Sequence, residues 1–200
     1  MWHNQGVSGS WRNRAGKSGT GGAADRGERR ERRVPPPLDQ AALEALALRY
    51  VERFATTQGK LSDYLRRKIR ERGWQGEPIE VGAIATRFAE LGYINDRGYA
   101  EMKTASLVRR GYGERRITAA LHAARIGAAD AEEAVDQVRD GAFDHALAFA
   151  RRKRIGPFAS APANEDQRRK QLAAMVRAGH SFALSAKILR MTEPEDAVDD

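Results

Sequence analysis

Four arginines fall within eight consecutive positions of RRGYGERRITAAL, residues 109–121, where they surround two glycines and a tyrosine. The guanidinium group of arginine stays charged at physiological pH and can bind a phosphate or a carboxylate through two parallel hydrogen bonds. An apolar pattern with helical spacing begins directly after the segment. This chemistry fits a phosphate-binding loop, a nucleic-acid contact or a protein-docking surface. The alternative is a solvent-exposed turn between two helices.

The glycines of GYGERR do not complete a dinucleotide-binding fingerprint. Arg116 stands where the third glycine is needed, and the residues before the motif have helical periodicity where a strand is required. The chain also lacks a Walker-type lysine motif and any cysteine, and its acidic pairs resemble solvated faces. Its four histidines are too far apart for a local zinc motif, at positions 3, 122, 145 and 180. We therefore expect no catalytic residues, no metal, no cofactor and no enzymatic activity.

Two further arginine-rich segments occupy related places in the chain, LRRKIRERGW at 65–74 and ARRKRIGPF at 150–158. A fourth basic patch, at 168–170, is diluted by the acidic residues at 165 and 166. We take the first three segments as the candidate surface for a protein partner or DNA. Its residues are Arg66, Arg67, Arg70, Arg109, Arg110, Tyr112, Arg115, Arg116, Arg151, Arg152, Lys153 and Arg154.

An ordinary explanation exists for each basic segment taken alone. Amphipathic helices turn charged faces to water, and arginine at a helix end complements the helix dipole. Against this, the acidic residues are grouped at 130–140 and 193–200, which gives up the i,i+4 pairing that stabilises a helix. The pattern favours an anionic partner, either phosphate or carboxylate. Tyr112 and Trp74 could stack on that partner, or could fill the core at helix ends.

The net charge of +8 is unevenly divided along the chain. Residues 1–33 carry eight basic and three acidic residues, whereas the remainder is nearly balanced. With seven glycines in that stretch and VPPP after it, we predict a disordered basic tail over 1–37. There is no apolar signal region and no run of 18 apolar residues, so we expect a cytoplasmic protein without membrane contact.

From residue 38 onward, apolar residues recur three and four positions apart, which is typical of helices. The pattern runs through three rounds of three helices, with Ile69, Leu121 and Met175 at matching places, 52 and 54 residues apart. We predict an all-α, elongated array of three tandem three-helix repeats, because no single unit of this size buries its apolar face alone. The repeats span 38–94, 95–143 and 144–192, and an acidic, frayed C-terminus follows at 193–200.

Residue types at the helix ends predict where several helices begin and stop. We expect Thr56 or Thr57 to cap the second helix and Gly73 to end it. The third helix should begin after Glu77, with a proline at position 78 in its first turn, and Asn95 or Asp96 should cap the fourth.

The chain resembles the RecX family of bacterial RecA modulators. The resemblance rests on D-x-x-Y-A-E at 96–101 followed by RRGYGERRI, and on LRRKIRERGW, AELGYINDRGYA, ARRKRIGPF and MVRAGHSFALSAKIL. It covers about residues 40–192. Two features depart from the family pattern: Arg125 stands where the middle helix usually ends in glycine, with Gly127 two residues later, and the first middle helix is about one turn longer.

The resemblance implies a non-enzymatic regulator that acts in DNA repair and the SOS response. RecX-like proteins bind the RecA–single-stranded DNA filament in its helical groove and oppose its extension. They thereby lower ATP hydrolysis, strand exchange and LexA co-cleavage. The resemblance also gives Arg109, Arg110, Arg115 and Arg116 the binding role, in a protein that we expect to be a monomer. Tyr99, Ile117 and Leu121 match the family too, but their apolar spacing predicts a core position.

Two other functions fit the same residues. Three-helix units resemble helix-turn-helix domains, so the chain could be an autonomous nucleic-acid-binding protein. It could also be a scaffold that recognises an acidic protein and has no role on DNA.

Overall fold

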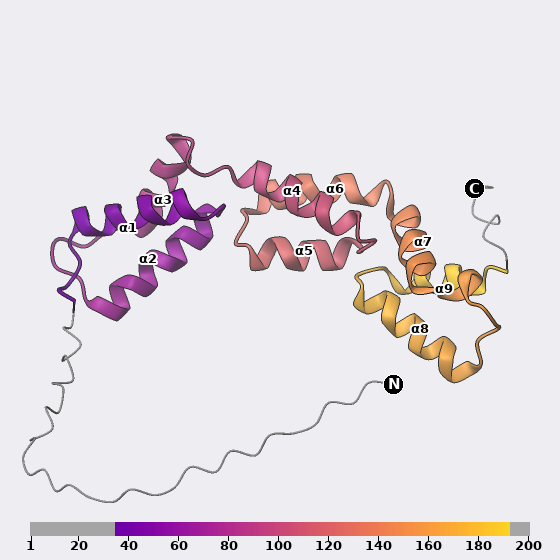
Figure 1. Cartoon of the computed structure of the whole chain (residues 1–200). Coiled ribbons are helices and arrows are strands. Elements are labelled where there is room, and N and C mark those ends of the chain that lie inside the picture. The colour runs from indigo at the N-terminus through magenta and orange to yellow at the C-terminus, as the bar shows by residue number, and fades with distance from the viewer. Residues whose placement is uncertain (1–34, 193–200) are drawn as a thin grey trace, which may run out of the picture. The chain divides into compact units, whose positions relative to one another are not determined.

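The computed structural model describes residues 35–192, and within that range the fold is all-α (Figure 1). Residues 1–34 of the basic tail predicted at 1–37, and the acidic terminus predicted at 193–200, lie outside the described residues. Pro36, which the sequence placed in the disordered tail, instead accepts hydrogen bonds from Arg72 Nε and Nη2 at 3.2 and 2.9 Å.

Nine α-helices and one 3₁₀ helix make up the described part of the chain. The first group contains α1 (Gln40–Arg53), α2 (Gln58–Arg72) and α3 (Val81–Glu90). The second contains α4 (Asp96–Val108), α5 (Glu114–Ala123) and α6 (Ala128–Arg139). The third contains α7 (Ala142–Lys153), η1 (Gly156–Phe158), α8 (Glu165–Arg177) and α9 (Phe182–Arg190).

Each helix group encloses its own apolar core, whereas from the sequence we expected neighbouring units to supply the core jointly. Leu43, Leu61 and Leu65 centre the first core, Ile117 and Leu121 the second, and Met175 and Ile188 the third, all fully buried. Ile69, which matches Leu121 and Met175 in sequence, is only partly buried at the edge of the first core. The tandem three-helix arrangement predicted from the sequence is therefore confirmed.

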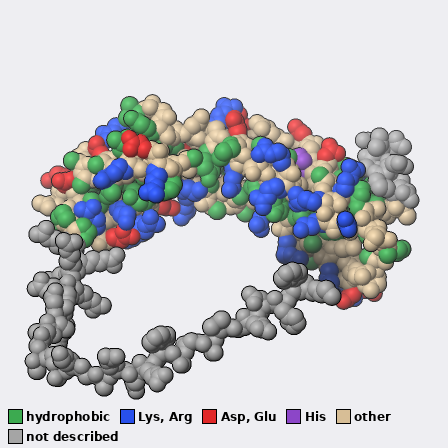
Figure 2. All heavy atoms as spheres, viewed as in Figure 1, with side chains coloured by type: hydrophobic (Ala, Val, Ile, Leu, Met, Phe, Trp, Pro, Cys, Tyr) green, Lys and Arg blue, Asp and Glu red, His purple; other side chains and the backbone are tan. Residues whose placement is uncertain are grey.

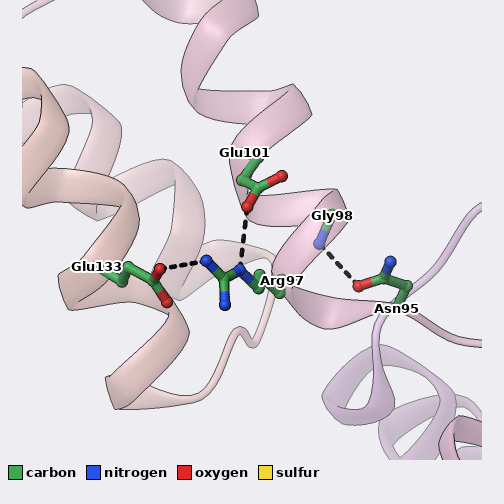
Figure 3. Close-up of polar contacts among 5 residues, drawn as sticks. All are labelled: Asn95, Arg97, Gly98, Glu101 and Glu133. Atoms are coloured by element: carbon green, nitrogen blue, oxygen red, sulfur yellow. Dashed lines mark hydrogen bonds and ion pairs between the residues drawn. The ribbon is translucent and has the colours of Figure 1, made fainter.

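The helix caps decide between the alternatives that the sequence left open. Thr57 caps α2 through a 3.1 Å bond from Lys60 N, and Asn95 caps α4 through a 2.8 Å bond from Gly98 N (Figure 3). Gly73 ends α2 with a φ of +84°, a conformation that a residue with a side chain adopts at a cost. Two helix starts differ from expectation, since α3 begins three residues after the proline at 78, and α7 begins at residue 142, ahead of the expected boundary.

The middle helices α2, α5 and α8 connect consecutive groups in a repeated way. The last carbonyls of a helix lack partners within that helix, so another segment has to satisfy them. After α5, the carbonyl of Ala124 accepts a 2.6 Å bond from Thr57 Oγ1 at the start of α2. After α8, the carbonyl of Ala178 accepts a 3.0 Å bond from Gly113 N at the start of α5. We call these contacts the first and the second joint.

The segment before α1 completes the series at the end of α2. Leu38, which is fully buried, donates its N–H to the carbonyl of Gly73 at 3.0 Å and accepts from Gln75 N at 2.8 Å. Leu38 thereby donates a hydrogen bond to a carbonyl at the end of α2. At each joint, a residue at the start of one middle helix does the same for a carbonyl at the end of the next middle helix. Leu38 and Trp74 form the isolated β-bridge of the described residues.

Candidate functional site

The two glycines of GYGERR are required by packing at the second joint. A Cβ on Gly113 would lie 2.5 Å from the carbonyl oxygen of Gly179, and one on Gly111 would lie 3.0 Å from the backbone nitrogen of Phe149. Gly179, with a φ of +99°, is equally confined, because its Cβ would lie 2.5 Å from Arg116 N. The motif thus brings two backbones together, and nothing in its geometry resembles a nucleotide-binding loop.

Tyr112 fills the space between two cores. Its half-buried side chain packs against both the second and the third apolar cluster. The guanidinium carbons of Arg110 and Arg116 lie 5.0 and 5.5 Å from the centre of its ring, within the range of cation–π attraction. Tyr112 therefore supports the basic residues around it, and of the two roles left open by the sequence its packing favours the core.

The four arginines of the second segment are without acidic partners in the described structure. Within residues 35–192, Arg109, Arg110, Arg115 and Arg116 form no ion pair, and all four are exposed. Arg115 and Arg116 also lie in the first turn of α5, where the positive end of the helix dipole disfavours a cation. The expectation that arginine complements the dipole is therefore wrong for these two residues.

Acidic residues accompany the first basic segment, contrary to expectation. Arg66 and Arg67 lie 3.6 Å from Asp63 and Glu71 respectively, and Lys68 Nζ lies 2.6 Å from Glu71. The hydrogen bond from Lys68 is the main cause that lowers the pKa of Glu71. These carboxylates lie three or four residues from their arginines along α2, so they are neighbours on the helix surface although they form no acidic block in the sequence. Arg70 alone among the three predicted residues of this segment has no ion pair within the described range.

The third basic segment keeps its charges unpaired. Arg151, Arg152, Lys153 and Arg154 are all exposed and form no ion pair in the part of the chain that the structure describes. The guanidinium carbons of Arg151 and Arg152 lie over the rings of Phe158 and Phe149, at 5.1 and 5.6 Å from their centres. The diluted patch at 168–170 does form ion pairs, with Glu165 and Asp166.

Lys and Arg side chains lie over all three helix groups on one face, whereas Asp and Glu lie mainly toward its edges (Figure 2). The unpaired members of the candidate surface belong mostly to the second and third groups. On exposed surfaces an ion pair contributes little to stability, so the lack of partners mainly leaves these guanidinium groups available for an external anion.

Two histidines at the second joint were not recognised from the sequence as part of the site. His180 is buried, and its Nε2 lies 3.0 Å from the carbonyl oxygen of Gly111. Burial lowers the pKa of His180, and the contact with Gly111 opposes that shift in part. His145 Nδ1 is buried without a hydrogen-bond partner within residues 35–192. These histidines are recognised as part of the site only from the structure, where the end of α8 contacts the start of α5. In the sequence, 69 residues separate Gly111 from His180.

Other arginines of the second group are held by carboxylates. Arg97 Nε and Nη2 lie 3.1 and 2.5 Å from Glu101 and Glu133, so one guanidinium group ties α4 to α6 (Figure 3). Arg139 Nε pairs with Glu114 at 3.0 Å, and this bond is the main cause that raises the pKa of Arg139. These structural pairs contrast with the unpaired candidates on the same group.

Across the described residues, no three His, Asp or Glu side chains are grouped so that they could hold a metal ion. None of the helices between residues 35 and 192 combines the length and the apolar content needed to cross a bilayer.

Comparison with known proteins gives the family. Residues 95–135, which cover most of α4–α6, match the family model described as RecX, second three-helix domain. The Regulatory protein RecX of Myxococcus xanthus is 34% identical to this chain over 177 residues, which are 82% of this chain and 91% of that protein. The chain belongs to the RecX family. The Regulatory protein RecX of Agrobacterium fabrum is 29% identical over 160 residues, covering 77% of this chain and 86% of its own length.

Solved RecX structures have the same fold. The crystal structure of RecX from Lactobacillus salivarius matches with a TM-score of 0.56 at 19% identity, covering 76% of this chain and 95% of that chain. A second crystal structure, of regulatory protein RecX, matches with a TM-score of 0.51 at 21% identity over 74% of this chain and 72% of its own. The family and the all-α repeat fold expected from the sequence are both confirmed.

Proposed function

We propose that this RecX family chain is a non-enzymatic regulator that binds the RecA–single-stranded DNA filament. It mainly inhibits the recombinase, ATPase and co-protease activities of RecA, and so acts in DNA repair and the SOS response. The partner is the RecA filament in the cytoplasm, with single-stranded DNA as part of it, and the protein acts as a monomer without a cofactor.

The observation that carries this proposal is the state of the arginines at the second joint. Four guanidinium groups have no carboxylate partner in the described structure; those of Arg110 and Arg116 lie over the ring of Tyr112, and two of the four occupy a helix start that disfavours cations. Such an arrangement gives up stability at a surface that would gain from an anionic partner. The family relationship makes the filament the leading candidate, since it presents both nucleic-acid phosphates and protein carboxylates.

The proposal is tested by adding the protein to preformed RecA filaments and measuring ATP hydrolysis. We expect equimolar protein to reduce the hydrolysis rate at low salt. Substituting Arg109, Arg110, Arg115 and Arg116 with Glu should weaken that inhibition at least tenfold, because removing a charge-assisted hydrogen bond costs about 1 kcal/mol or more. The helical circular dichroism should stay unchanged, since none of the four makes an ion pair within the described residues.

A matched variant separates the position of the charges from their number. Reversing four other exposed basic residues to Glu gives the same change in net charge: Arg49, Arg53, Arg168 and Arg190. This control should inhibit nearly as well as the original chain. Equal loss of inhibition in both variants would mean that only overall charge matters and would reject the proposed site.

The second candidate function, autonomous nucleic-acid binding, rests on the same unpaired arginines. It is distinguished by measuring DNA binding without RecA over a salt series. Tight and sequence-selective binding by the protein alone would favour it. Weak, non-selective binding that falls steeply with salt would fit the filament regulator.

A further inference from the structure

A polar hollow lies at the first joint, outside the candidate residues of the second and third segments. Its volume is 490 Å³, and it is lined by Gly59, Asp63, Arg66, His122, Arg125 and Ile126. The lining comes from α2 and from the end of α5, which the first joint brings together. Three cationic or hydrogen-bonding side chains therefore surround a single carboxylate.

That carboxylate is shared by two arginines. Arg125 Nε lies 3.0 Å from Asp63 Oδ2, and Arg66 Nη1 lies 3.6 Å from Asp63 Oδ1. All three side chains remain at least half exposed, at 65%, 53% and 50% for Arg125, Arg66 and Asp63. Water screens such pairs, so an external anion can take the place of the carboxylate at little cost.

The backbone of Arg125 supports a role for its side chain beyond packing. Arg125 has a φ of +58°, a left-handed conformation in which a Cβ is unfavourable and glycine is preferred. The opposing residue is Gly59, on which a Cβ would collide with Arg125 Cβ. The joint thus accommodates a strained arginine by having a glycine opposite it. Strain that surrounding structure maintains is often associated with function.

We propose that Arg125 and Arg66, with His122 beside them, form a binding subsite for a backbone phosphate of single-stranded nucleic acid, and that Asp63 occupies this subsite until phosphate displaces it. This inference rests on the proposed function for the source of the strand. A phosphate fits better than a partner's carboxylate, because exchanging Asp63 for another carboxylate restores the same bond. A strand held at Arg70, one turn along α2 from Arg66, supplies its next phosphates at high local concentration.

The subsite adds Arg125 and His122 to a candidate surface in which the sequence had already placed Arg66. Arg125 was noted there only as a departure at a helix end, yet it lies with Arg66 at one hollow although 59 residues separate the two in the chain. Bound phosphate would remove Asp63 from the ion pair with Arg125 and so weaken a contact of the first joint. Binding of a strand and the strength of that joint are therefore coupled.

The test measures binding of the full chain to a fluorescent single-stranded oligonucleotide by anisotropy, without RecA, over a salt series starting at low salt. Arg125→Gly removes the cation and at the same time relieves the left-handed strain, so the variant should keep its folded stability. We expect binding to weaken roughly threefold to tenfold and the slope of log affinity against log salt to fall by about 0.7, the value for one phosphate contact on a single strand.

Two further variants complete the test. Arg87→Ala removes one cation and one ion pair, the 2.8 Å contact with Glu44, at a place remote from the hollow, and should leave the salt slope unchanged. Asp63→Asn empties the subsite and should tighten binding by a similar factor. No measurable binding of the original chain at low salt, or equal behaviour of Arg125→Gly and Arg87→Ala, would overturn the subsite.

The same variants distinguish the subsite from the proposed function. If Arg125→Gly loses co-sedimentation with RecA filaments but binds oligonucleotide normally, the hollow receives a protein carboxylate and the phosphate assignment is wrong. If the original chain binds oligonucleotide through the subsite but does not reduce RecA ATP hydrolysis, the subsite stands and the proposed function fails.

Discussion

The two joints connect successive helix groups by different kinds of contact. At the first joint, side chains make the bonds: Thr57 Oγ1 donates to Ala124 O at 2.6 Å, Asp96 Oδ1 accepts from Gln58 N at 3.0 Å, and Arg125 Nε donates to Asp63 Oδ2 at 3.0 Å. At the second joint, backbone meets backbone, with Gly113 N on Ala178 O at 3.0 Å and Arg115 N on Gly179 O at 3.2 Å. Both joints bring segments close together, at Gly59 and at Gly113, but the hydrogen bonds across the first joint come mainly from side chains and those across the second mainly from backbone.

The difference has a consequence for binding. At the second joint Tyr112 packs against two cores, and Arg110 and Arg116 lie over its ring, so that surface is organised before a partner arrives. The first joint contains charges that an anion can reach, so a partner can alter it. A preorganised surface loses less entropy on binding, whereas an exchangeable one can transmit binding to the joint.

The largest expected effect comes from adding a methyl group at the second joint. Gly179→Ala should destabilise the fold by about 2–5 kcal/mol, from left-handed strain together with a collision that the backbone of Arg116 cannot easily relieve. Urea unfolding measures the loss. Gly92→Ala is the matched control, because Gly92 also has a positive φ, of +81°, but its Cβ would meet nothing within 4 Å. Equal losses in both variants would mean that the joint is not closely packed.

A smaller loss is expected at the first joint from Thr57→Val. The substitution removes the cap of α2 and leaves the carbonyl of Ala124 without its donor, at a cost of about 1–3 kcal/mol. The neighbouring residue gives a control of the same size, since Thr56 Oγ1 is buried without a partner in the described range. Thr56→Val should be neutral or stabilising. A larger loss from Thr56→Val than from Thr57→Val in thermal unfolding would contradict the assigned contacts.

Much of the fold could be predicted because its signals are local. Apolar spacing gives the helices, and short polar residues or glycine at positions such as Thr57, Asn95 and Gly73 give their ends. The proline at 78 misled because it marks an extended segment as readily as a first helical turn. The intrinsic preference of proline does not decide between an extended segment and a first helical turn. The packing of α3 against α2 decides it.

The site was harder to predict because its decisive contacts join distant residues. The exposed arginines of the second and third segments follow from the sequence, but the acidic partners of Arg66 and Arg67 one turn away did not stand out. Neither the glycine contacts of the second joint nor the convergence of Arg125 on Asp63 leaves a local pattern. Both kinds of contact form only where the end of one middle helix meets the start of another, so they can be identified only from the structure.

The smallest expected effect is a pH dependence that differs between the joints. Burial lowers the pKa of His180 at the second joint, so protons bind the unfolded chain more readily than the folded one. Stability contributed by neutral His180 is present above about pH 6.5, the usual value for histidine, and declines as the pH falls below it. Thermal unfolding should show lower stability at pH 5.5 than at pH 7.5, and His180→Gln should largely abolish that difference.

Asp96 at the first joint should respond in the opposite direction and in a more acidic range. Burial raises the pKa of this carboxyl, against the hydrogen bond from Gln58 N, so the folded chain binds the proton more readily than the unfolded chain. Its contribution therefore becomes more favourable as the pH falls toward 4. Asp96→Asn keeps an acceptor for Gln58 N and should remove only that acidic response. If His180→Gln instead altered the acidic range and Asp96→Asn the range near neutrality, the two joints would not be the separate titrating units that their contacts indicate.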